Sequence, residues 1–284
     1  DGPGATSTYE GGAVLEPVVG FYDEPVVTLD FASLYPSIMQ KHNLCYSTML
    51  PPQAPQQVAE DGSGEILEEV VPGLGHRFVS SRLRRGLVPM VLEELLSARA
   101  KAKKELKSVV ANGGDPQLRA VLDGRQLALK ISANSVYGFT GMSRGALPCQ
   151  AIAASVTAYG RQMIERAKEL VESNLSSARG RHCDARVVYG DTDSVMLTLG
   201  RTLPIDDVFS LGKEAAQIVS DAFGAPVKME FEKVYHPFLL MNKKRYAGLS
   251  FGSPQDAGKL DFKGIEVVRR DWCLLVRQMV ERSL

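Results

Sequence analysis

The sequence is poor in cysteine, and its cysteines stand far apart. None of the four forms a C-x-x-C pair, and the four histidines show no spacing typical of metal ligands. This pattern argues against a zinc or iron–sulfur site in this segment, because such modules place their ligands at short, fixed intervals. Scattered cysteines are instead typical of reduced thiols in an intracellular protein.

Long hydrophobic stretches are also missing. No run of about 18 apolar residues occurs, so we expect no transmembrane span and no membrane partner. The chain starts with the residues DGPG, without an initiator methionine and without the basic and apolar segments of a signal peptide. We therefore expect a fragment or a processed product that is not secreted.

The chain has no net charge, because 33 Lys and Arg balance 33 Asp and Glu. The charges are nevertheless unevenly distributed. Residues 51–76 carry five acids and no Lys or Arg, whereas residues 77–107 carry nine Lys or Arg and three Glu. The basic block predicts contact with a polyanion such as nucleic acid. A solvated helix face is the alternative explanation.

Hydrophobic patterning predicts an α+β protein. With 284 residues, 44% of them hydrophobic and 23% charged, the chain can bury a full globular core. Helical patterns cover residues 87–110, 115–136, 150–175 and 206–223 and return after 272, and strand patterns cover 26–29, 185–199 and 227–251. Residues 111–114 (ANGG) break the first helix, and Asp115-Pro116 opens the next, so these two helices form an antiparallel hairpin.

The segment YGDTDS at residues 189–194 is the most informative part of the chain. It lies between two apolar runs, residues 185–188 and 195–199, and its composition is typical of a turn. We predict a β-hairpin with Asp191 and Asp193 at its tip. Crowded carboxylates repel each other, and a bound cation offsets that cost. On the hairpin alone, aspartates that only cap their own turn are the better explanation.

A third acid, Asp30, favours the metal interpretation. Residues 26–29 indicate a buried strand, and Asp30 ends it before an apolar and aromatic stretch. An acid at the end of a buried strand is costly unless it is paired or bound to a metal. Considered alone, Asp30 could equally cap a helix. Two strand-end carboxylate sites and the basic helix pair together suggest phosphoryl or nucleotidyl transfer with two metal ions.

Four motifs, in order, resemble those of the B-family DNA polymerases. Residues 30–38 (DFASLYPSI) match motif A of that family, residues 130–138 (KISANSVYG) motif B, residues 189–194 motif C, and residues 243–246 (KKRY) the basic motif that holds primer and template. Residues 43–46 and 268–271 are most similar to the eukaryotic replicative polymerases of the delta class. Herpesvirus-like and large DNA-virus members share several of these runs and are the alternative.

The resemblance implies three polymerase subdomains within an α+β fold. Residues 1–50 and 140–251 would form the palm, an antiparallel sheet with helices. Residues 77–139 would form the inserted helical-hairpin fingers, after a surface loop or insertion at 51–76. Residues 252–284 would begin the thumb.

The carboxylates are the predicted catalytic centre. We expect Asp30 and Asp193 to bridge two Mg²⁺ ions about 4 Å apart, one activating the primer 3′-hydroxyl and one holding the triphosphate. Few carboxylates suffice, because Mg²⁺ keeps waters. The resemblance adds the carbonyl of Phe31 as a further ligand. Asp191 is the weaker catalytic candidate, because two alternating hairpin residues cannot both face the metals at close range.

The helical hairpin supplies predicted ligands for the incoming deoxynucleoside triphosphate (dNTP). Lys130, Asn134 and Tyr137 share one helical face by their spacing. Arg99 precedes the hairpin loop by about as far as Lys130 follows it, so at ~1.5 Å per residue the two cations are level within about a turn. Such a pair can clamp a triphosphate. The resemblance implies phosphate binding by Arg99, Lys130 and Asn134, with Tyr137 near the nascent base pair. The apolar neighbours of Lys130 argue against its full exposure.

Two further segments take their predicted roles from the resemblance. Tyr35 would pack under the sugar and exclude a 2′-hydroxyl, although a tyrosine before proline is by itself more typical of a core position. Lys243, Lys244 and Arg245, with Tyr246, would bind DNA through phosphates or minor-groove acceptors. A solvated surface cluster is the alternative for this run.

We therefore predict a DNA-directed DNA polymerase that uses Mg²⁺ and dNTPs on primer–template DNA. The resemblance also implies a nuclear replication protein that binds accessory subunits and a sliding clamp through regions outside this chain. A catalytically incomplete fragment that binds DNA or dNTP without turnover is the alternative. The intact carboxylates disfavour a non-enzymatic interaction module.

Overall fold

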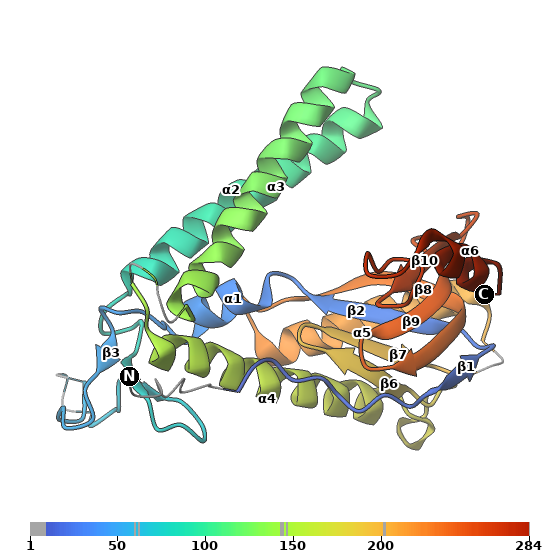
Figure 1. Ribbon diagram of the computed structural model, residues 1–284. Helices are drawn as coiled ribbons and strands as arrows, with labels where there is room; N and C mark the ends of the chain where they lie inside the picture. The colour runs from blue at the N-terminus through green and yellow to red at the C-terminus, as the bar shows by residue number, and fades with distance from the viewer. Residues whose placement is uncertain are drawn as a thin grey trace, which may run out of the picture. The chain divides into compact units, whose positions relative to one another are not determined.

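The computed structural model describes residues 10–59, 61, 63–142, 145, 147–200 and 203–283 (Figure 1). These residues divide into two compact units. One, here called the hairpin unit, contains residues 10–11 and 33–160, and the other, the sheet unit, contains residues 12–32 and 161–283.

The sheet unit is built on an antiparallel sheet that has seven strands in the described part of the chain. The strands are β1 (Gly20–Tyr22), β2 (Val26–Phe31), β6 (Arg186–Asp191), β7 (Ser194–Thr198), β8 (Met229–Asn242), β9 (Arg245–Phe251) and β10 (Lys259–Lys263). Their order is β10-β9-β8-β2-β7-β6, and β1 pairs with the C-terminal part of β8 (Figure 1). Strand β2, which carries Asp30, is therefore central and pairs with β7, the strand that follows the turn of Asp193.

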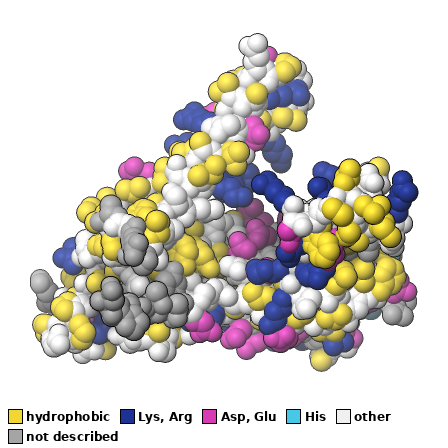
Figure 2. All heavy atoms as spheres, in the orientation of Figure 1, with side chains coloured by type: hydrophobic (Ala, Val, Ile, Leu, Met, Phe, Trp, Pro, Cys, Tyr) yellow, Lys and Arg dark blue, Asp and Glu magenta, His cyan; other side chains and the backbone are white. Residues whose placement is uncertain are grey.

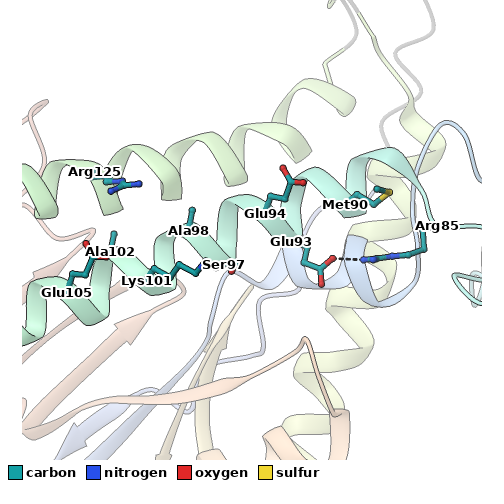
Figure 3. Close-up of a pocket in the computed structure, with 10 residues that line it drawn as sticks. All are labelled: Arg85, Met90, Glu93, Glu94, Ser97, Ala98, Lys101, Ala102, Glu105 and Arg125. Carbon is teal, nitrogen blue, oxygen red and sulfur yellow. Dashed lines mark hydrogen bonds and ion pairs between the residues drawn. The ribbon is translucent and has the colours of Figure 1, made fainter.

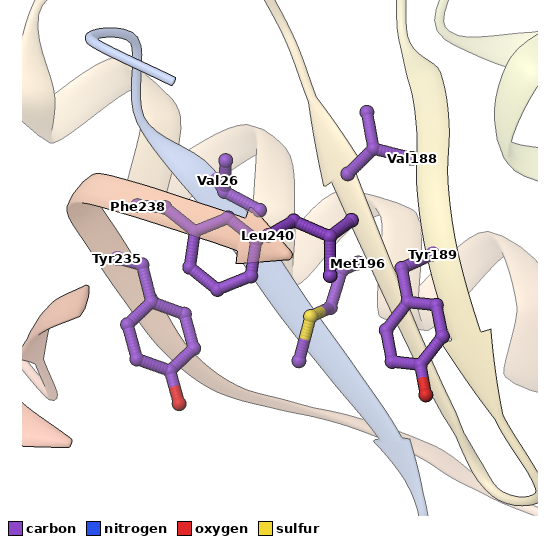
Figure 4. Close-up of a cluster of buried hydrophobic side chains, with 7 residues drawn as sticks. All are labelled: Val26, Val188, Tyr189, Met196, Tyr235, Phe238 and Leu240. Atoms are coloured by element: carbon purple, nitrogen blue, oxygen red, sulfur yellow. The ribbon is translucent and has the colours of Figure 1, made fainter. Parts of the chain in front are cut away.

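Apolar side chains from four strands form the core of the sheet unit. The cluster contains Val26, Val188, Tyr189, Met196, Tyr235, Phe238 and Leu240 (Figure 4). Helix α5 (Ile205–Phe223) packs on β2 and β8, where its Phe209 ring lies 5.3 Å from that of Phe231. Gly212 lets α5 approach, since a Cβ there would lie 2.8 Å from the Phe231 ring. The strand ends are thus fixed by a well-packed sheet.

Strand β10 is tied to β8 by a half-buried polar network that reaches across β9. Asp261 accepts hydrogen bonds from Lys233 Nζ at 2.8 Å and from the Tyr235 hydroxyl at 2.7 Å. Burial raises the pKa of the Asp261 carboxyl, but these hydrogen bonds outweigh it and hold that pKa below its ordinary value. Gly248 of β9 provides the space that this network needs, because a Cβ there would lie 2.8 Å from the Tyr235 ring.

The hairpin unit contains two long antiparallel helices, α2 (Leu87–Ala111) and α3 (Pro116–Thr140) (Figure 1). The α2 helix ends where Gly113 takes a φ of +64°, a conformation that favours glycine. The Asp115 side chain then caps α3 by accepting from the Gln117 amide at 2.9 Å. Helix α1 (Leu34–Lys41) packs against both helices.

The remaining elements are shorter or cross the boundary between the units. Strands β3 (Met49–Leu50), β5 (Arg77–Val79) and β4 (Glu68–Val70) form a small antiparallel sheet in that order. Helix α4 (Gln150–Asn174) contains the unit boundary at residue 160. A 3₁₀ turn, η1 (Ser177–Arg179), follows α4, and helix α6 (Leu274–Ser283) follows the sheet. Among the described residues, no helix is both long and apolar enough to cross a bilayer.

The α+β prediction is confirmed, and so are the main helices and the carboxylate hairpin. Two features were missed. Strand β10 lies where the sequence reads as a loop, because its alternating residues are charged, and β4 lies within the predicted loop at 51–76. The β4–β5 pair also joins the acidic and basic blocks, since Arg77 and Glu68 form an ion pair of 2.7 Å.

We predict opposite stability effects for two Gly→Ala substitutions inside helices. Gly212→Ala should destabilise the protein by about 1–3 kcal/mol, because the new methyl group overpacks the interface between α5 and the sheet. Gly124→Ala is the matched control: its Cβ meets nothing within 4 Å, and alanine there should stabilise α3 by about 0.5–1 kcal/mol. Urea unfolding followed by circular dichroism measures both. Equal changes in the free energy of unfolding for the two variants would contradict the close approach of α5 to the sheet at Gly212.

Candidate active site

Strand register places acidic residues in a row across four strands of the sheet unit. Asp30 lies opposite Ser194 of β7 and opposite Glu230 of β8. Ser194 in turn lies opposite Asp191 of β6. Directly opposed residues of antiparallel strands share one face of the sheet. The residues Glu230, Asp30, Ser194 and Asp191 therefore form a polar row across one end of the sheet.

Two of the ladders in this row contain a β-bulge close to it, one on β8 beside β2 and one on β6 beside β7. The β2–β8 register shifts between Thr28 and Leu29, just before Asp30. The β6–β7 register shifts between Val187 and Tyr189, just before Asp191. A bulge bends its strand and redirects the side chains that follow it. The two bulged strands are those that present Glu230 and Asp191, so the ladders on both sides of the row depart from regular pairing, as is common beside active sites.

The turn that carries Asp193 is strained. Thr192 has a φ of +59°, which is an outlier for a β-branched residue. The amide of Asp193 donates to the carbonyl of Asp191 at 2.6 Å, so the turn closes over three residues. Two more hydrogen bonds hold it: Thr192 N donates to Ala13 O at 2.8 Å, and Phe31 N donates to Asp193 O at 2.7 Å. Such strain costs about 1–3 kcal/mol and occurs mainly at functional sites.

The bond from Phe31 to Asp193 joins the two predicted metal-binding segments. It extends the β2–β7 ladder beyond the pair of Asp30 with Ser194. Asp30 and Asp193 therefore belong to neighbouring backbone positions, although they are far apart in sequence. Register brings the three residues together along the backbone but places Asp193 opposite Phe31 and not opposite Asp30, and their roles remain predictions.

Asp191 is engaged by a cation from the basic run. Its two carboxylate oxygens lie 2.6 and 2.7 Å from Lys244 Nζ. From the sequence we expected that Asp191 and Asp193 cannot both face the metals, and register puts Asp191 on the same face as Asp30. The ion pair gives Asp191 a role in holding Lys244.

Tyr189 adds a second connection between this hairpin and the basic run. Its hydroxyl accepts a hydrogen bond from the Lys244 amide at 2.7 Å. Burial raises the pKa of the Tyr189 phenol, so the ring stays neutral at physiological pH. The β6–β7 hairpin and the β8–β9 turn are therefore joined by both a side-chain and a main-chain contact.

The other residues of the basic run are also engaged within the sheet unit. Lys243 forms an ion pair with Glu16, and Arg245 forms one with Glu266. The Tyr246 ring packs against Phe238 at 5.5 Å and Tyr235 at 6.1 Å. Lys243 and Lys244 are exposed, whereas Arg245 and Tyr246 are half-buried. The two lysines are thus the members best exposed for contact with a polyanion.

The donors at the strand ends suit a hard divalent cation. Asp30, Asp193 and the carbonyl of Phe31 offer only oxygen, which Mg²⁺ and Ca²⁺ prefer, and Mg²⁺ needs only one or two carboxylates besides water and substrate oxygens. In the part of the chain that the structure describes, no cluster of three or more His, Cys, Asp or Glu side chains is placed to hold a metal ion. The chemistry of these donors therefore fits a metal shared with a substrate better than an all-protein cage.

In the hairpin unit, helix α1 brings together several predicted nucleotide-binding residues. The rings of Tyr35 and Tyr137 lie 4.3 Å apart between centroids, at an angle of 50°. Arg99 Nη1 donates to Ser33 Oγ at 3.1 Å. Ser33 itself has a φ of +52° and directly precedes α1. Arg99 is thus oriented by the residue at the helix start, a contact that the sequence did not suggest.

Lys130 and Asn134 lie exposed on α3, and one expectation about them is wrong. The apolar neighbours of Lys130 do not shield it: Leu127 is 49% and Ile131 60% exposed. Figure 2 shows apolar and basic side chains side by side on the surface of the hairpin. An exposed lysine on such a face remains available to an anionic ligand.

A hollow of about 550 Å³ lies along α2 and does not include these residues (Figure 3). Its ionisable lining consists of three cations (Arg85, Lys101 and Arg125) and three acids (Glu93, Glu94 and Glu105). The balanced charge is unsuited to a triphosphate. Arg85 is also paired with Glu93, as Arg82 is with Glu65, so part of the basic block at 77–107 is neutralised within the protein.

Known proteins resemble the chain along almost its whole length. It is 53% identical over 284 residues to the DNA polymerase delta catalytic subunit of Arabidopsis thaliana, covering 98% of this chain and 24% of that protein. The Schizosaccharomyces pombe subunit is 52% identical over 289 residues, covering 99% and 25%, and that of Mesocricetus auratus is 54% identical over 277 residues, covering 97% and 24%. The chain thus spans about a quarter of the length of these relatives.

The predicted resemblance to the delta class is confirmed by these relatives. The family model for DNA polymerase family B matches residues 2–284, which include all four motifs and both units. The chain therefore belongs to DNA polymerase family B.

Proposed function

We propose that this chain carries the catalytic centre of a DNA-directed DNA polymerase. The reaction is nucleotidyl transfer from a dNTP to a primer 3′-hydroxyl, directed by template DNA. The observation that carries the proposal is the row of strand-end acids that contains Asp30 and ends beside Asp193, in a chain of family B. Such transfer depends on positioning and on stabilising phosphoryl charge, for which fixed carboxylates on a rigid sheet are suited.

Asp30 and Asp193, with the Phe31 carbonyl, would hold two Mg²⁺ ions. Bound there, the ions would lower the pKa of the primer hydroxyl and offset charge on the triphosphate. The hydrogen bonds that hold the turn at Thr192 and the ladders on both sides of β2 would fix the two backbones that present these oxygens. Asp191 would act mainly through Lys244, whose ammonium it holds.

Residues of the hairpin unit would bind the incoming nucleotide. Arg99, Lys130 and Asn134 would donate to its phosphates, with Arg99 held by Ser33. Guanidinium and ammonium groups suit this role because they combine charge with several donors. Tyr35 would exclude a 2′-hydroxyl, and its contact with Tyr137 supports a defined ring position near the sugar and base.

Lys243 and Lys244 would contact primer–template DNA, with Arg245 and Tyr246 beside them at the start of β9. We further propose a nuclear replication enzyme that binds accessory subunits and a sliding clamp through other parts of the whole protein.

Primer extension with Mg²⁺ and dNTPs tests the proposed polymerase function. A protein that binds primer–template and dNTP but never extends the primer would favour the alternative, a fragment that binds without turnover.

We predict that Asp30→Asn and Asp193→Asn each lower primer extension below a few per cent of wild type in the full-length protein, because each removes a metal-binding charge. Asp191→Asn should be milder and should act mainly on primer–template affinity, since it loosens Lys244. Single-turnover extension measures the chemistry, and DNA titration measures the affinity. An Asp30→Asn or Asp193→Asn protein that has a native circular dichroism spectrum and extends the primer at more than a few per cent of the wild-type rate would contradict these roles.

We predict that Arg99→Ala and Lys130→Ala impair dNTP use at least tenfold in kcat/KM, about 1.4 kcal/mol, because each removes a cation that faces the triphosphate. Arg125→Ala is the matched control, since Arg125 is an exposed cation on the same helix as Lys130. Steady-state kinetics at saturating primer–template measure the effect. If the control loses as much as Lys130→Ala, general charge on α3 explains the result and the specific role of Lys130 is wrong.

We predict that Tyr35→Ala relaxes sugar discrimination, because the bulky ring that would meet a 2′-hydroxyl is gone. Competition between ribo- and deoxynucleotides for the same template position gives the ratio. Tyr137→Ala serves as a comparison, since it removes the partner ring of Tyr35 without removing Tyr35 itself. An unchanged ratio in a folded Tyr35→Ala protein would leave Tyr35 as a packing residue only.

A further inference from the structure

The basic turn between β8 and β9 rests on a glycine from a later segment. Gly264 has a φ of +64°, and a Cβ built there would lie 2.0 Å from the carbonyl oxygen of Lys244. No side chain fits at that distance. The Lys244 backbone therefore lies directly against residue 264, although the two are twenty positions apart. Among the described glycines, Gly264 has the closest such contact.

The residues after Gly264 anchor this support in the core and reach back to the turn. Ile265 is fully buried and packs with Ala247 of β9 and with Val267. Glu266, whose side chain is 19% exposed, forms an ion pair with Arg245. The Arg245 Nε is buried and has no hydrogen-bond partner among the described residues. The guanidinium thus reaches Glu266 through its Nη2, although the Arg245 side chain is still 38% exposed.

The turn is held from its other side as well. Lys244 takes a φ of +60°, which is uncommon for a residue with a side chain. Its amide donates to the Tyr189 hydroxyl at 2.7 Å, and its ammonium contacts Asp191. Lys244 therefore lies between the carboxylate hairpin and residue 264, in a conformation that its own sequence does not favour. Strain of this kind persists only where the surrounding structure over-determines the backbone, as the contacts on both sides of Lys244 do here.

We propose that residues 264–266 are the positioning element of the DNA-binding turn. Because it lacks a side chain, Gly264 lets the Lys244 backbone approach closely and so fixes its position. Glu266 holds Arg245 by an ion pair. Lys243 and Lys244 thereby face the DNA phosphates. Arg245 is in this view a positioning residue and not a DNA contact. The inference rests on the proposed DNA polymerase function and deepens it, by dividing the basic run into residues that touch DNA and residues that hold the turn.

Gly264→Ala in the full-length protein tests this assignment. Gly180→Ala is the matched control, because Gly180 has a similar φ of +75° in the same unit but no atom within 4 Å of a new Cβ. We expect the Kd for primer–template to rise about fivefold or more for Gly264→Ala only. We plot the logarithm of the DNA association constant against the logarithm of the salt concentration. The slope of this plot should become shallower by about 0.9 for each phosphate that a lysine no longer neutralises. The KM for dNTP should stay within about twofold of wild type.

A double-mutant cycle separates positioning from general loss of stability. In a Lys244→Ala background, Gly264→Ala should weaken DNA binding much less than in wild type, because the lysine that it would displace is already absent. Glu266→Gln provides a milder variant that tests the Arg245 support if Gly264→Ala does not fold. It should weaken DNA binding and leave the dNTP KM unchanged.

Three outcomes would overturn the inference while leaving the polymerase function intact. They are equal DNA affinity of Gly264→Ala and Gly180→Ala, full additivity with Lys244→Ala, and a Glu266→Gln protein with wild-type affinity and salt slope. A wild-type protein that neither binds primer–template nor extends it would instead refute the proposed function itself.

Discussion

The mutual repulsion of acids at one end of a buried sheet is the constraint on which this structure depends. Asp30, Asp191 and Glu230 share one row, and carboxylates in such a row raise the energy of the fold unless cations oppose them. Lysines engage both ends of it: Lys228 lies 3.0 Å from Glu230, and Lys244 contacts Asp191. Asp30 lies between these two pairs in the row. The charges on either side of it therefore come from the start of β8, from β6 and from the turn after β8.

Strained backbone gathers around the same row. Thr192 and Lys244 both take a positive φ, and the amide of each donates a hydrogen bond to a residue distant in sequence, Thr192 to the Ala13 carbonyl and Lys244 to the Tyr189 hydroxyl. Strain of this kind persists only where the surroundings over-determine it. The apolar cluster of β2, β6, β7 and β8 supplies the rigid base. Stability of the sheet and geometry of the site are therefore coupled.

Much of this could be predicted from the sequence, because the relevant signals are local. A turn between apolar runs indicated the carboxylate hairpin, and Asp115-Pro116 marked the start of α3. What could not be predicted depends on contacts between distant residues. Strand β10 forms because Asp261 meets Lys233 and Tyr235, and nothing in residues 259–263 alone indicates those partners. The exposure of Lys130 was misjudged for the same reason, since apolar neighbours in sequence do not guarantee a packed surface.

The division of labour within the basic run follows from the same distinction between local and distant contacts. As a sequence, residues 243–246 offer three equivalent cations. In the structure their acidic partners differ: Glu16 is 84% exposed, so its hold on Lys243 is weak, whereas Glu266 is 19% exposed and its pair with Arg245 is partly shielded from water. Exposed ion pairs contribute little and exchange partners readily, while half-buried pairs resist exchange because a lone charge would be left desolvated. A phosphate can therefore displace Glu16 from Lys243 far more easily than it can displace Glu266 from Arg245.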